Sequence, residues 1–592
     1  MINFYGPPYS SPNILTVKTI CPENFKDEIY RESGAAIQHH RIGFANTEIL
    51  KFTEFVDSSH PVYFRNFNHK ENTKDSAPIS FHIKPAAPET IQKLIKVKLG
   101  EKECYLLITY PGGKIFHYPT VLTSFHWIIP FGNCEIKENK GLIFVPRAGK
   151  SSLAIVGHND FSVGLPIAEK IAETNPTDSF NCTKNYWNKF TKNRETLTEN
   201  FDLLPPKYKK IIDGVATLIK IQQSDDGGEM AGHYYPLAYA RDQYGVAKGM
   251  LALGMFAEAK SALNFRFNKF IHFGNLRNAE SMGTHCARHI HENDDVEQTG
   301  YIILQARDYY NKTGDKKFIN KIFPMLNWCW NAQKKHLAGG SLPFNGDETY
   351  VAGGFFPRSG LLHGSADSTL VFIESGKWLA EWAMKNKLWE KAFAENQLKS
   401  IDETIKSWRA LFFYKNKILA NAPERINFIS PPRFRHGVCE NLCSWFGWTQ
   451  RAKSGRYQCP LCFGKKILPA NSPTKTEIFS VALLPTFIES DILNVNELAD
   501  VVNHILEMEK SNGHIPTVPN GAGCVGYDAG FLLLALKKLN HPATQRVENR
   551  LINMLDERGA WNEYYDENDK FKETSCRYRP WESAINAFAL IQ

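Results

Sequence analysis

The strongest constraint on the fold is a run of helical periodicity that begins near residue 205 and continues to residue 592. Apolar residues recur there with the 3.6-residue period of amphipathic helices. Glycines and prolines at the expected cap and first-turn positions mark many of the boundaries. Together these signals predict twelve helices: 206–223, 236–254, 255–272, 295–314, 315–337, 365–387, 388–414, 474–490, 494–512, 526–540, 541–559 and 579–592. This part of the chain is therefore expected to be all-α.

The connections between these helices alternate between very short and long. Those after the even-numbered helices are nearly absent, so the helices that they join are antiparallel neighbours. The connections after the odd-numbered helices are long: 224–235, 273–294, 338–364, 415–473, 513–525 and 560–578. This alternation puts every long loop at the same end of the helices. We therefore expect six hairpins that close into an (α/α)6 barrel over residues 196–592, with functional residues on the long loops.

The preceding part of the chain has a different pattern. Short apolar or alternating runs bounded by Gly, Pro and Asn, such as FHWIIPF, GLIFVP and SLAIVG, are typical of β-strands. No helical period of more than two turns stands out before residue 165. The pattern predicts an N-terminal β-sandwich domain over residues 1–195.

Composition excludes several classes of protein. A chain of 592 residues with 43% apolar and 22% charged residues can bury a large core, so it is not disordered or collagen-like. The net charge of 70 − 62 = +8 is too small to indicate general binding of polyanions. Apolar stretches stay below the roughly 18–20 residues of a membrane helix, and the first residues do not resemble a secretory signal. We expect a cytoplasmic protein with no membrane partner.

Four of the twelve cysteines form two closely spaced pairs: Cys439, Cys443, Cys459 and Cys462. Two such pairs, separated by about 15–20 residues, can close a tetrahedral thiolate site around zinc. Because four thiolates leave no open coordination position, the predicted zinc is structural. The motif predicts a small zinc-ribbon-like insertion at 430–466 in the longest loop. Disulfides or free thiols are the alternative, and a chain without an export signal disfavours disulfides.

Charged and aromatic side chains gather in the loops that the barrel would bring to one mouth. They are Tyr239, Arg241, Asp242, Asp294, Asp347, Glu348, Trp561, Glu563, Trp581 and Glu582. Aromatic rings and hydroxyls are suited to bind sugar rings. Two carboxylates on opposite walls of such a pocket are what cleavage of a glycosidic bond needs, because one protonates the leaving oxygen while the other activates water or attacks carbon. Solvated loop acids are the alternative. The pattern predicts a carbohydrate substrate and no organic cofactor.

Residues 205–592 resemble the catalytic domain of the glucoamylase-like, six-hairpin glycosidases (glycoside hydrolase family 15-type). The matching stretches are IKIQQSDDGGEMAG, YARDQYGVAKGMLALG, DVEQTGYIILQARDYYNKTGD, GDETY and GAWNEYYDENDKF followed by RPWESAINAFAL. Each motif is weak alone, but their order and their places on the expected loops are specific. Bacterial and archaeal members also carry an N-terminal β-sandwich, which fits the first part of this chain.

The resemblance implies an exo-acting glycosidase for an α-linked oligosaccharide or glycoside, with inversion at the anomeric carbon. It gives Glu348 the role of general acid and Glu563 that of general base. It also implies that Arg241 and Asp242 hydrogen-bond the sugar in the innermost subsite. The family usually has a tryptophan and paired acids around the general acid, whereas this chain has Asn-Gly-Asp-Glu, so Asp347 is an alternate acid. Glu582 is a second candidate for the base.

Other functions fit parts of the same pattern. A phosphorylase on the same barrel would use phosphate in place of the general base, and His363 and Ser365 could bind that phosphate. A catalytically inactive sugar-binding protein would have the same loops. The basic, aromatic-rich zinc segment could instead bind nucleic acid, although most such ribbons only staple a loop and we do not expect a nucleic-acid partner. The oligomeric state is left open.

Overall fold

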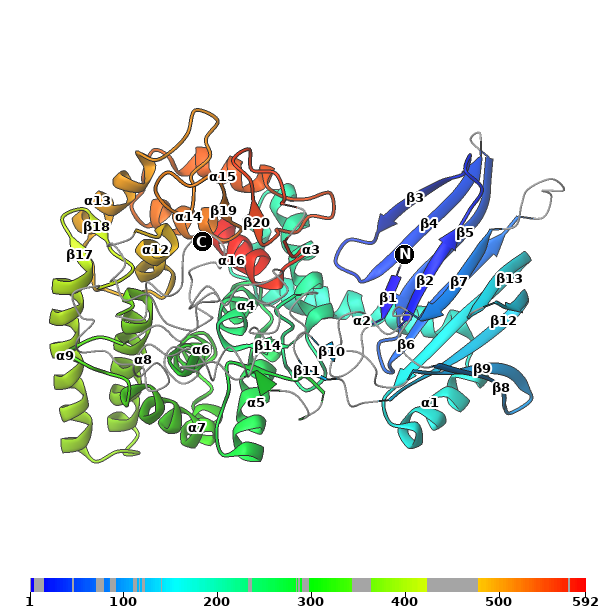
Figure 1. Ribbon diagram of the computed structural model, residues 1–592, viewed down its shortest axis with the longest axis horizontal. Helices are drawn as coiled ribbons and strands as arrows, with labels where there is room; N and C mark the ends of the chain where they lie inside the picture. Colours follow the sequence, from blue (N-terminus) through cyan, green and yellow to red (C-terminus); the bar gives the residue numbers. More distant parts are fainter. Residues whose placement is uncertain are drawn as a thin grey trace, which may run out of the picture. The chain divides into compact units, whose positions relative to one another are not determined.

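The computed structural model describes residues 2–4, 15–44, 47–70, 79–85, 92–109, 114–115, 118–119, 123–139, 141–232, 237–283, 285, 288–289, 298–342, 364–422, 477–572 and 575–592. The chain divides into two compact units (Figure 1). The first contains Met1–Ile221, His233–Leu237 and Ser281–Ala287, and the second contains Gln222–Gly232, Ala238–Glu280 and Arg288–Gln592. The predicted zinc-ribbon insertion at 430–466 lies outside the described residues. No helix in the described ranges is long and apolar enough to cross a membrane.

The first unit is built on an antiparallel β-sheet, as the alternating sequence pattern predicts. Its main path runs β1-β2-β7-β13-β6-β5-β4-β3, and β12 joins β13 to β9, which also pairs with β8. The strands are β1 (Ile2–Phe4), β2 (Leu15–Ile20), β3 (Lys26–Arg31), β4 (Ile37–Phe44), β5 (Thr47–Val56), β6 (Val62–His69), β7 (Ser80–Pro85), β8 (Gln92–Leu99), β9 (Lys102–Thr109), β12 (Ser124–Glu138) and β13 (Leu142–His158).

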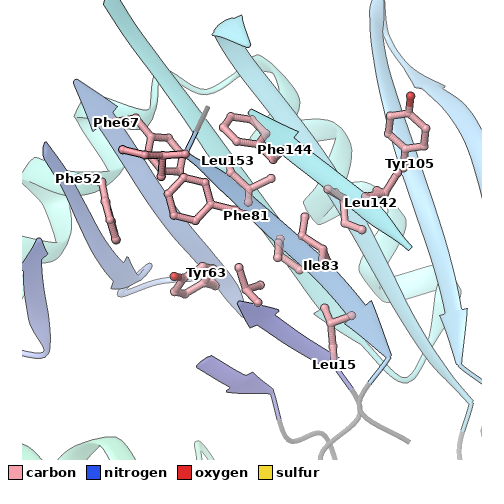
Figure 2. Packing of buried hydrophobic residues seen from close by; sticks show 14 of the residues in the cluster. Leu15, Phe52, Tyr63, Phe67, Phe81, Ile83, Tyr105, Leu142, Phe144 and Leu153 are labelled. Carbon is pink, nitrogen blue, oxygen red and sulfur yellow. The ribbon is translucent and has the colours of Figure 1, made fainter. Parts of the chain in front are cut away.

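The long strand β13 joins two parts of this sheet. Near its start β13 pairs with β7, and near its end it pairs with β6. The register of β12 against β13 shifts between Gly132 and Cys134, where Gly132 has a φ of 71° that favours glycine. One face of the sheet carries an apolar cluster that includes Phe52, Phe67 and Phe81 (Figure 2).

A buried ionic group lies on the same inner face. Arg65 Nη2 contacts Glu54 Oε2 at 2.7 Å, and His40 Nε2 lies 3.3 Å from Glu54 Oε1. The Arg65 guanidinium also lies 4.7 Å from the ring centre of Phe52 and 4.8 Å from that of Phe81. Burial opposes ionisation of Glu54, but its contacts with His40, Arg65 and Tyr63 lower its pKa to about 2. The group is a buried cluster of opposite charges in the first unit.

Two helices cover the other face of the sheet, and this corrects the sequence prediction. Residues that were expected to continue the β-sandwich form α1 (Phe161–Glu173) and α2 (Pro176–Leu197). Ala168 and Ile171 of α1 and Trp187 of α2 join the apolar cluster on that face. Both helices begin at a residue whose side chain accepts a backbone N–H, Asp160 for α1 and Asn175 for α2.

All twelve predicted barrel helices are present, and their ends differ from the predicted ones by up to six residues. They are α3 (Pro206–Gln222), α4 (Ala240–Ala252), α5 (Phe256–Phe273), α6 (Gln298–Thr313), α7 (Lys316–Lys334), α8 (Ala366–Lys385), α9 (Lys391–Phe412), α12 (Phe479–Phe487), α13 (Val495–Leu506), α14 (Asp528–Lys538), α15 (Thr544–Asn553) and α16 (Pro580–Ile591). The second unit holds α4 to α9 and α12 to α16.

Six helices of the second unit form a closed inner ring. Around the ring each helix packs on the next in the order α4, α6, α8, α12, α14, α16 and back to α4. The crossing of α4 and α16 is close, because a Cβ at Gly245 would lie 2.3 Å from Trp581 Cδ1. The outer helices α5, α7, α9, α13 and α15 each pack on inner neighbours. The inner ring of the predicted (α/α)6 barrel and five of its outer helices are therefore present in the second unit, while α3 falls in the first unit except for its last residue.

The inner helices run in one direction, which defines two ends of the barrel. Side chains from the first turns of α4 and α16 meet at one end, where Arg579 contacts Asp242. Side chains from the last turns of α4 and α6 and from the end of α12 meet at the other end, where Lys248 contacts Asp308 and Glu489. The long connections all lead into the first turns of inner helices. We call this end the mouth.

Short strands tie the long connections of the mouth together. In the first two connections β14 (Ala238–Tyr239) pairs with β15 (Ala279–Glu280). In the last two, β19 (Cys524–Val525) pairs with β20 (Tyr564–Tyr565). Backbone hydrogen bonds thus join four of the six long connections in pairs.

Candidate active site

The predicted site residues divide into two groups. Within the described ranges the structure brings together residues from the starts of α4 and α16 and from the last long connection: Arg241, Asp242, Glu563, Trp581 and Glu582. Tyr239, just before α4, and Trp561, in the last connection, are also described. Outside those ranges lie Asp294, Asp347, Glu348, His363, Cys439, Cys443, Cys459 and Cys462.

Arg241 and Asp242 lie in the first turn of α4. Tyr239 is the residue that precedes this helix, and its side chain is buried. The Arg241 guanidinium lies 4.4 Å from the ring centre of Trp581, and its Nη2 lies 3.7 Å from Asp242 Oδ2. A cation over an indole face is held by the ring quadrupole as well as by charge. Trp581, in the first turn of α16, therefore lies against the first turn of α4.

Arg579, which was not predicted from the sequence, joins the acids of the mouth. Its Nη2 donates to Asp242 Oδ1 at 2.9 Å, and its Nε donates to Glu582 Oε2 at 3.0 Å. The residue is 4% exposed. Burial opposes its charge, but the neighbouring carboxylates of Glu582, Asp242 and Glu563 raise its pKa well above the ordinary value. Arg579 is therefore a permanent cation at the centre of the group.

Glu563 is held by the backbone of its own loop. Its Oε2 accepts the Cys576 N–H at 3.0 Å, and its own N–H donates to the Cys576 carbonyl at 3.0 Å. The Gly526 N–H donates to the Glu563 carbonyl at 2.8 Å. No described residue hydrogen-bonds to the other carboxylate oxygen, and the residue is 7% exposed. Among the described residues, Glu563 is therefore a buried acid with one carboxylate oxygen anchored by the backbone.

Glu582 lies in the first turn of α16 and is completely buried. Burial raises its pKa to about 7; Arg579 opposes this shift, whereas the charges of Glu563 and Asp242 add to it. Its Oε1 has no hydrogen-bond partner among the described residues. Of the two candidate bases, Glu563 is 7% exposed and Glu582 is 0% exposed.

The aromatic residues of the group belong to its walls. Trp561 is fully buried, and its indole N–H donates to the Leu551 carbonyl at 2.9 Å, so its side chain packs toward α15. Trp581 is also buried and lies between Arg241 and Tyr527, whose ring is stacked on it at 4.6 Å. Tyr527 directly precedes α14 and was not predicted as a site residue.

First turns of inner helices supply most of the acids. Asp242 begins α4, Asp367 begins α8, Asp528 begins α14 and Glu582 begins α16, and all four are buried. Burial raises the pKa of Asp528 to about 6, although Thr517 and the Val525 N–H donate to it. Carboxylates at helix N-termini interact favourably with the helix dipole. Asp528 is not among the residues predicted from the sequence, although it lies in the first turn of an inner helix, as Asp242 does.

A second polar cluster anchors the loop that carries Glu563. His514 Nδ1 and Arg550 Nη2 both contact Asp569 Oδ1, at 2.8 and 2.7 Å, and Arg550 Nε contacts Asp569 Oδ2 at 2.7 Å. Cys524 lies near enough for His514, Cys524 and Asp569 to resemble a metal-ligand group. Arg550 Nη2 lies 3.6 Å from Cys524 Sγ and supplies the positive charge there. The cluster is therefore a paired ionic anchor.

The fold is shared with solved structures of carbohydrate-active enzymes. A bacterial glucoamylase complexed with acarbose matches with a TM-score of 0.60 and 10% identity, covering 98% of this chain and 88% of that one. A putative kojibiose phosphorylase from the human microbiome matches with a TM-score of 0.54 and 9% identity, covering 94% of this chain and 75% of that one. No protein-family model and no curated protein matches the sequence. The chain has the six-hairpin glycosidase fold over most of its length.

Proposed function

We propose that the protein is an exo-acting glycoside hydrolase that cleaves an α-linked oligosaccharide or glycoside with inversion. The observation that carries the proposal is the setting of Glu563. Its carboxylate is anchored on one oxygen by the Cys576 amide and is close enough to Arg579 to raise that residue's pKa. Through Arg579 it is linked to Asp242. The fold, which this chain shares with a glucoamylase bound to acarbose, supports a carbohydrate as the ligand.

In the proposed reaction Glu563 takes a proton from water, and the water oxygen attacks the anomeric carbon. The bond from that carbon to the glycosidic oxygen breaks as Glu348 donates a proton to the leaving oxygen. An inverting pair of carboxyl groups stands roughly 6.5–9.5 Å apart to leave room for this water, whereas roughly 5–5.5 Å would indicate retention. Arg241 and Asp242 would hydrogen-bond the sugar that is attacked.

Phosphorolysis is the second candidate, favoured by the fold shared with a putative kojibiose phosphorylase. The charges of the described part of the mouth favour hydrolysis. Arg579 is bound to two carboxylates, and Arg241 lies against Asp242 and Trp581. Ser365, a candidate phosphate ligand, donates its hydroxyl proton to Asp367. A phosphate would have to approach several buried acids, and the arginines and the serine that could bind it are already engaged with protein groups.

The test is sugar release from a panel of α-linked oligosaccharides and aryl glycosides, with and without phosphate. Glu348→Gln and Glu563→Gln are compared with Glu567→Gln, an exposed acid of the same loop as Glu563. Release that needs no phosphate and is lost in the first two variants alone would support the hydrolase. Release that requires phosphate and survives Glu563→Gln would establish the phosphorylase instead.

A further inference from the structure

Arg579 links two carboxylates that come from different inner helices. Asp242 lies at the start of α4 and Glu582 at the start of α16, and each accepts one hydrogen bond from the Arg579 guanidinium. The guanidinium is planar, and its donors point in fixed directions. Two bonds from one such group therefore set the two carboxylates relative to each other as well as to Arg579.

The position of Arg579 is itself determined by neighbouring backbone. Its N–H donates to the Trp561 carbonyl at 3.2 Å, and its carbonyl accepts the Ser583 N–H at 3.2 Å as α16 begins. A Cβ at Gly232 would lie 3.0 Å from Arg579 Cδ and 2.8 Å from Cys576 Sγ, so the absence of a side chain there makes room for Arg579. The last mouth connection and the start of α16 thus fix the backbone of Arg579. The segment around Gly232 leaves room for its side chain.

Glu582 is suited to anchor Arg579 and not to touch a substrate. It is 0% exposed, and one of its oxygens is already bonded to Arg579. Asp242 is 2% exposed, and its second oxygen lies toward Arg241. Without Arg579, the carboxylates of Asp242, Glu563 and Glu582 would lose the cation that they share, and their mutual repulsion would displace them or protonate one of them.

We propose that Arg579 is a positioning residue of this site: it holds Asp242 in its sugar-binding orientation, and Glu582 holds Arg579 in place. The inference rests on the proposed function, because orienting Asp242 matters only if a sugar lies at the start of α4. Neither Arg579 nor Glu582 needs to contact the sugar. If Arg579 is a positioning residue, its effect on the reaction should depend on the presence of Asp242. An independent role in folding or sugar binding would not depend on Asp242.

A double-mutant cycle tests this coupling. Arg579→Lys keeps a positive charge but loses the planar guanidinium, whose donors reach both carboxylates. We expect kcat/KM to fall by about 100-fold, as for a small misplacement of a positioning group. Asp242→Asn should cause a comparable fall. The double variant should be no worse than the poorer single variant, because both changes remove one interaction. Glu582→Gln keeps an acceptor for Arg579 Nε, so a smaller fall of about 10-fold is expected.

The matched control is Arg65→Lys. Arg65 is an equally buried arginine with a carboxylate partner, but it belongs to the β-sheet of the first unit. This variant should lose stability and keep kcat/KM within a factor of about two, since it lies outside the site. Circular dichroism establishes that each variant is folded. If Arg579→Lys does not fold, the cycle is made with Glu582→Gln and Asp242→Asn. The loss of kcat/KM in that double variant should be smaller than the product of the two single losses.

Two results would overturn the inference: Arg579→Lys with more than half of the wild-type kcat/KM, or losses that multiply in the double variant. A wild-type protein that releases no sugar would contradict the proposed function instead. The inference can then still be judged by infrared spectroscopy of protonated carboxyl groups. A band absent in Glu582→Gln should titrate at a different pH in Arg579→Lys, and an unchanged titration would show that Arg579 does not hold Glu582.

Discussion

The Cys576 N–H donates to the Glu563 carboxylate at 3.0 Å, while the Glu563 N–H donates to the Cys576 carbonyl at 3.0 Å. Two hydrogen bonds thus join distant positions of the last mouth connection, and one of them is made by the side chain of the proposed base. The orientation of that carboxylate follows from backbone geometry. A variant that keeps an acceptor at this position should keep the local structure.

We therefore expect Glu563→Gln to fold normally and to lose sugar release by about 10²–10⁴-fold, the range typical of a lost general base. The glutamine oxygen can still accept the Cys576 N–H, but the amide cannot take a proton from water. The measurement is kcat/KM together with the melting temperature. Glu567→Gln, an exposed acid on the same loop, should behave as wild type. Full activity in Glu563→Gln would exclude it as the base.

The pH dependence of stability should reveal Glu582. Its pKa is raised to about 7 in the folded protein by burial, against about 4.3 for an unperturbed glutamate. Between these values the folded state binds more protons than the unfolded state, so stability falls as pH rises through this window. A shift of this size corresponds to roughly 3–4 kcal/mol that is present below pH ~4 and lost above pH ~7.

The check is the melting temperature at several pH values between about 4 and 8, with Glu582→Gln beside wild type. The glutamine cannot ionise, so the variant should lose less stability than wild type as pH rises. Asp528, whose pKa is raised to about 6, contributes a loss of the same sign in both proteins. Parallel curves for the two proteins would mean that the pKa of Glu582 is the same in the folded and unfolded states.

Much of the barrel could be predicted because its signals are local and repeated. Apolar residues recur along the helices with a helical period and each connection has a clear length, so the helices and their order follow from period and spacing. The helices α1 and α2 were missed for local reasons as well. Gly164 and Pro166 interrupt α1, and α2 is mostly polar, so neither shows a long apolar stripe.

The site was only partly predictable, for a different reason. Asp242, Glu563 and Glu582 could be named because each stands in a loop or first turn that the barrel brings to the mouth. Arg579 is bonded to Asp242, which is 337 residues away in the chain. Nothing in the sequence near either residue indicates that contact. It arises from closure of the ring, which brings the first turn of α16 against that of α4.

The Asp569 anchor should contribute to stability. Asp569 accepts hydrogen bonds from Arg550 and His514, and these contacts outweigh burial and lower its pKa to about 2. Asp569→Asn would leave the buried Arg550 without its counter-charge, and we expect a loss of about 1–3 kcal/mol in the free energy of unfolding at neutral pH. Glu557→Gln, an exposed acid in the same connection, should change little.

The pH dependence of stability gives a second test of the Asp569 anchor. A carboxylate with a lowered pKa stabilises the fold above its unfolded pKa of about 4, and that contribution disappears as pH falls toward 2. The difference in melting temperature between wild type and Asp569→Asn should therefore narrow below about pH 4. Because Asp569 lies in the loop that carries Glu563, kcat should fall together with stability. An unchanged melting temperature would show that the anchor is dispensable.

The predicted zinc is the part of the chain's chemistry that sugar release does not probe. Four thiolates at Cys439, Cys443, Cys459 and Cys462 would bind one zinc per chain and be protected by it from thiol reagents. Elemental analysis of the purified protein, with a mercurial titration that follows zinc release, checks this. Cys459→Ser should lower the zinc content, whereas Cys182→Ser, at an exposed free cysteine, should not.

Because a structural zinc staples its loop, Cys459→Ser should also make the protein more sensitive to proteolysis between residues 430 and 466. Protein from zinc-supplemented medium that contains no zinc, with all four thiols reactive, would contradict the prediction.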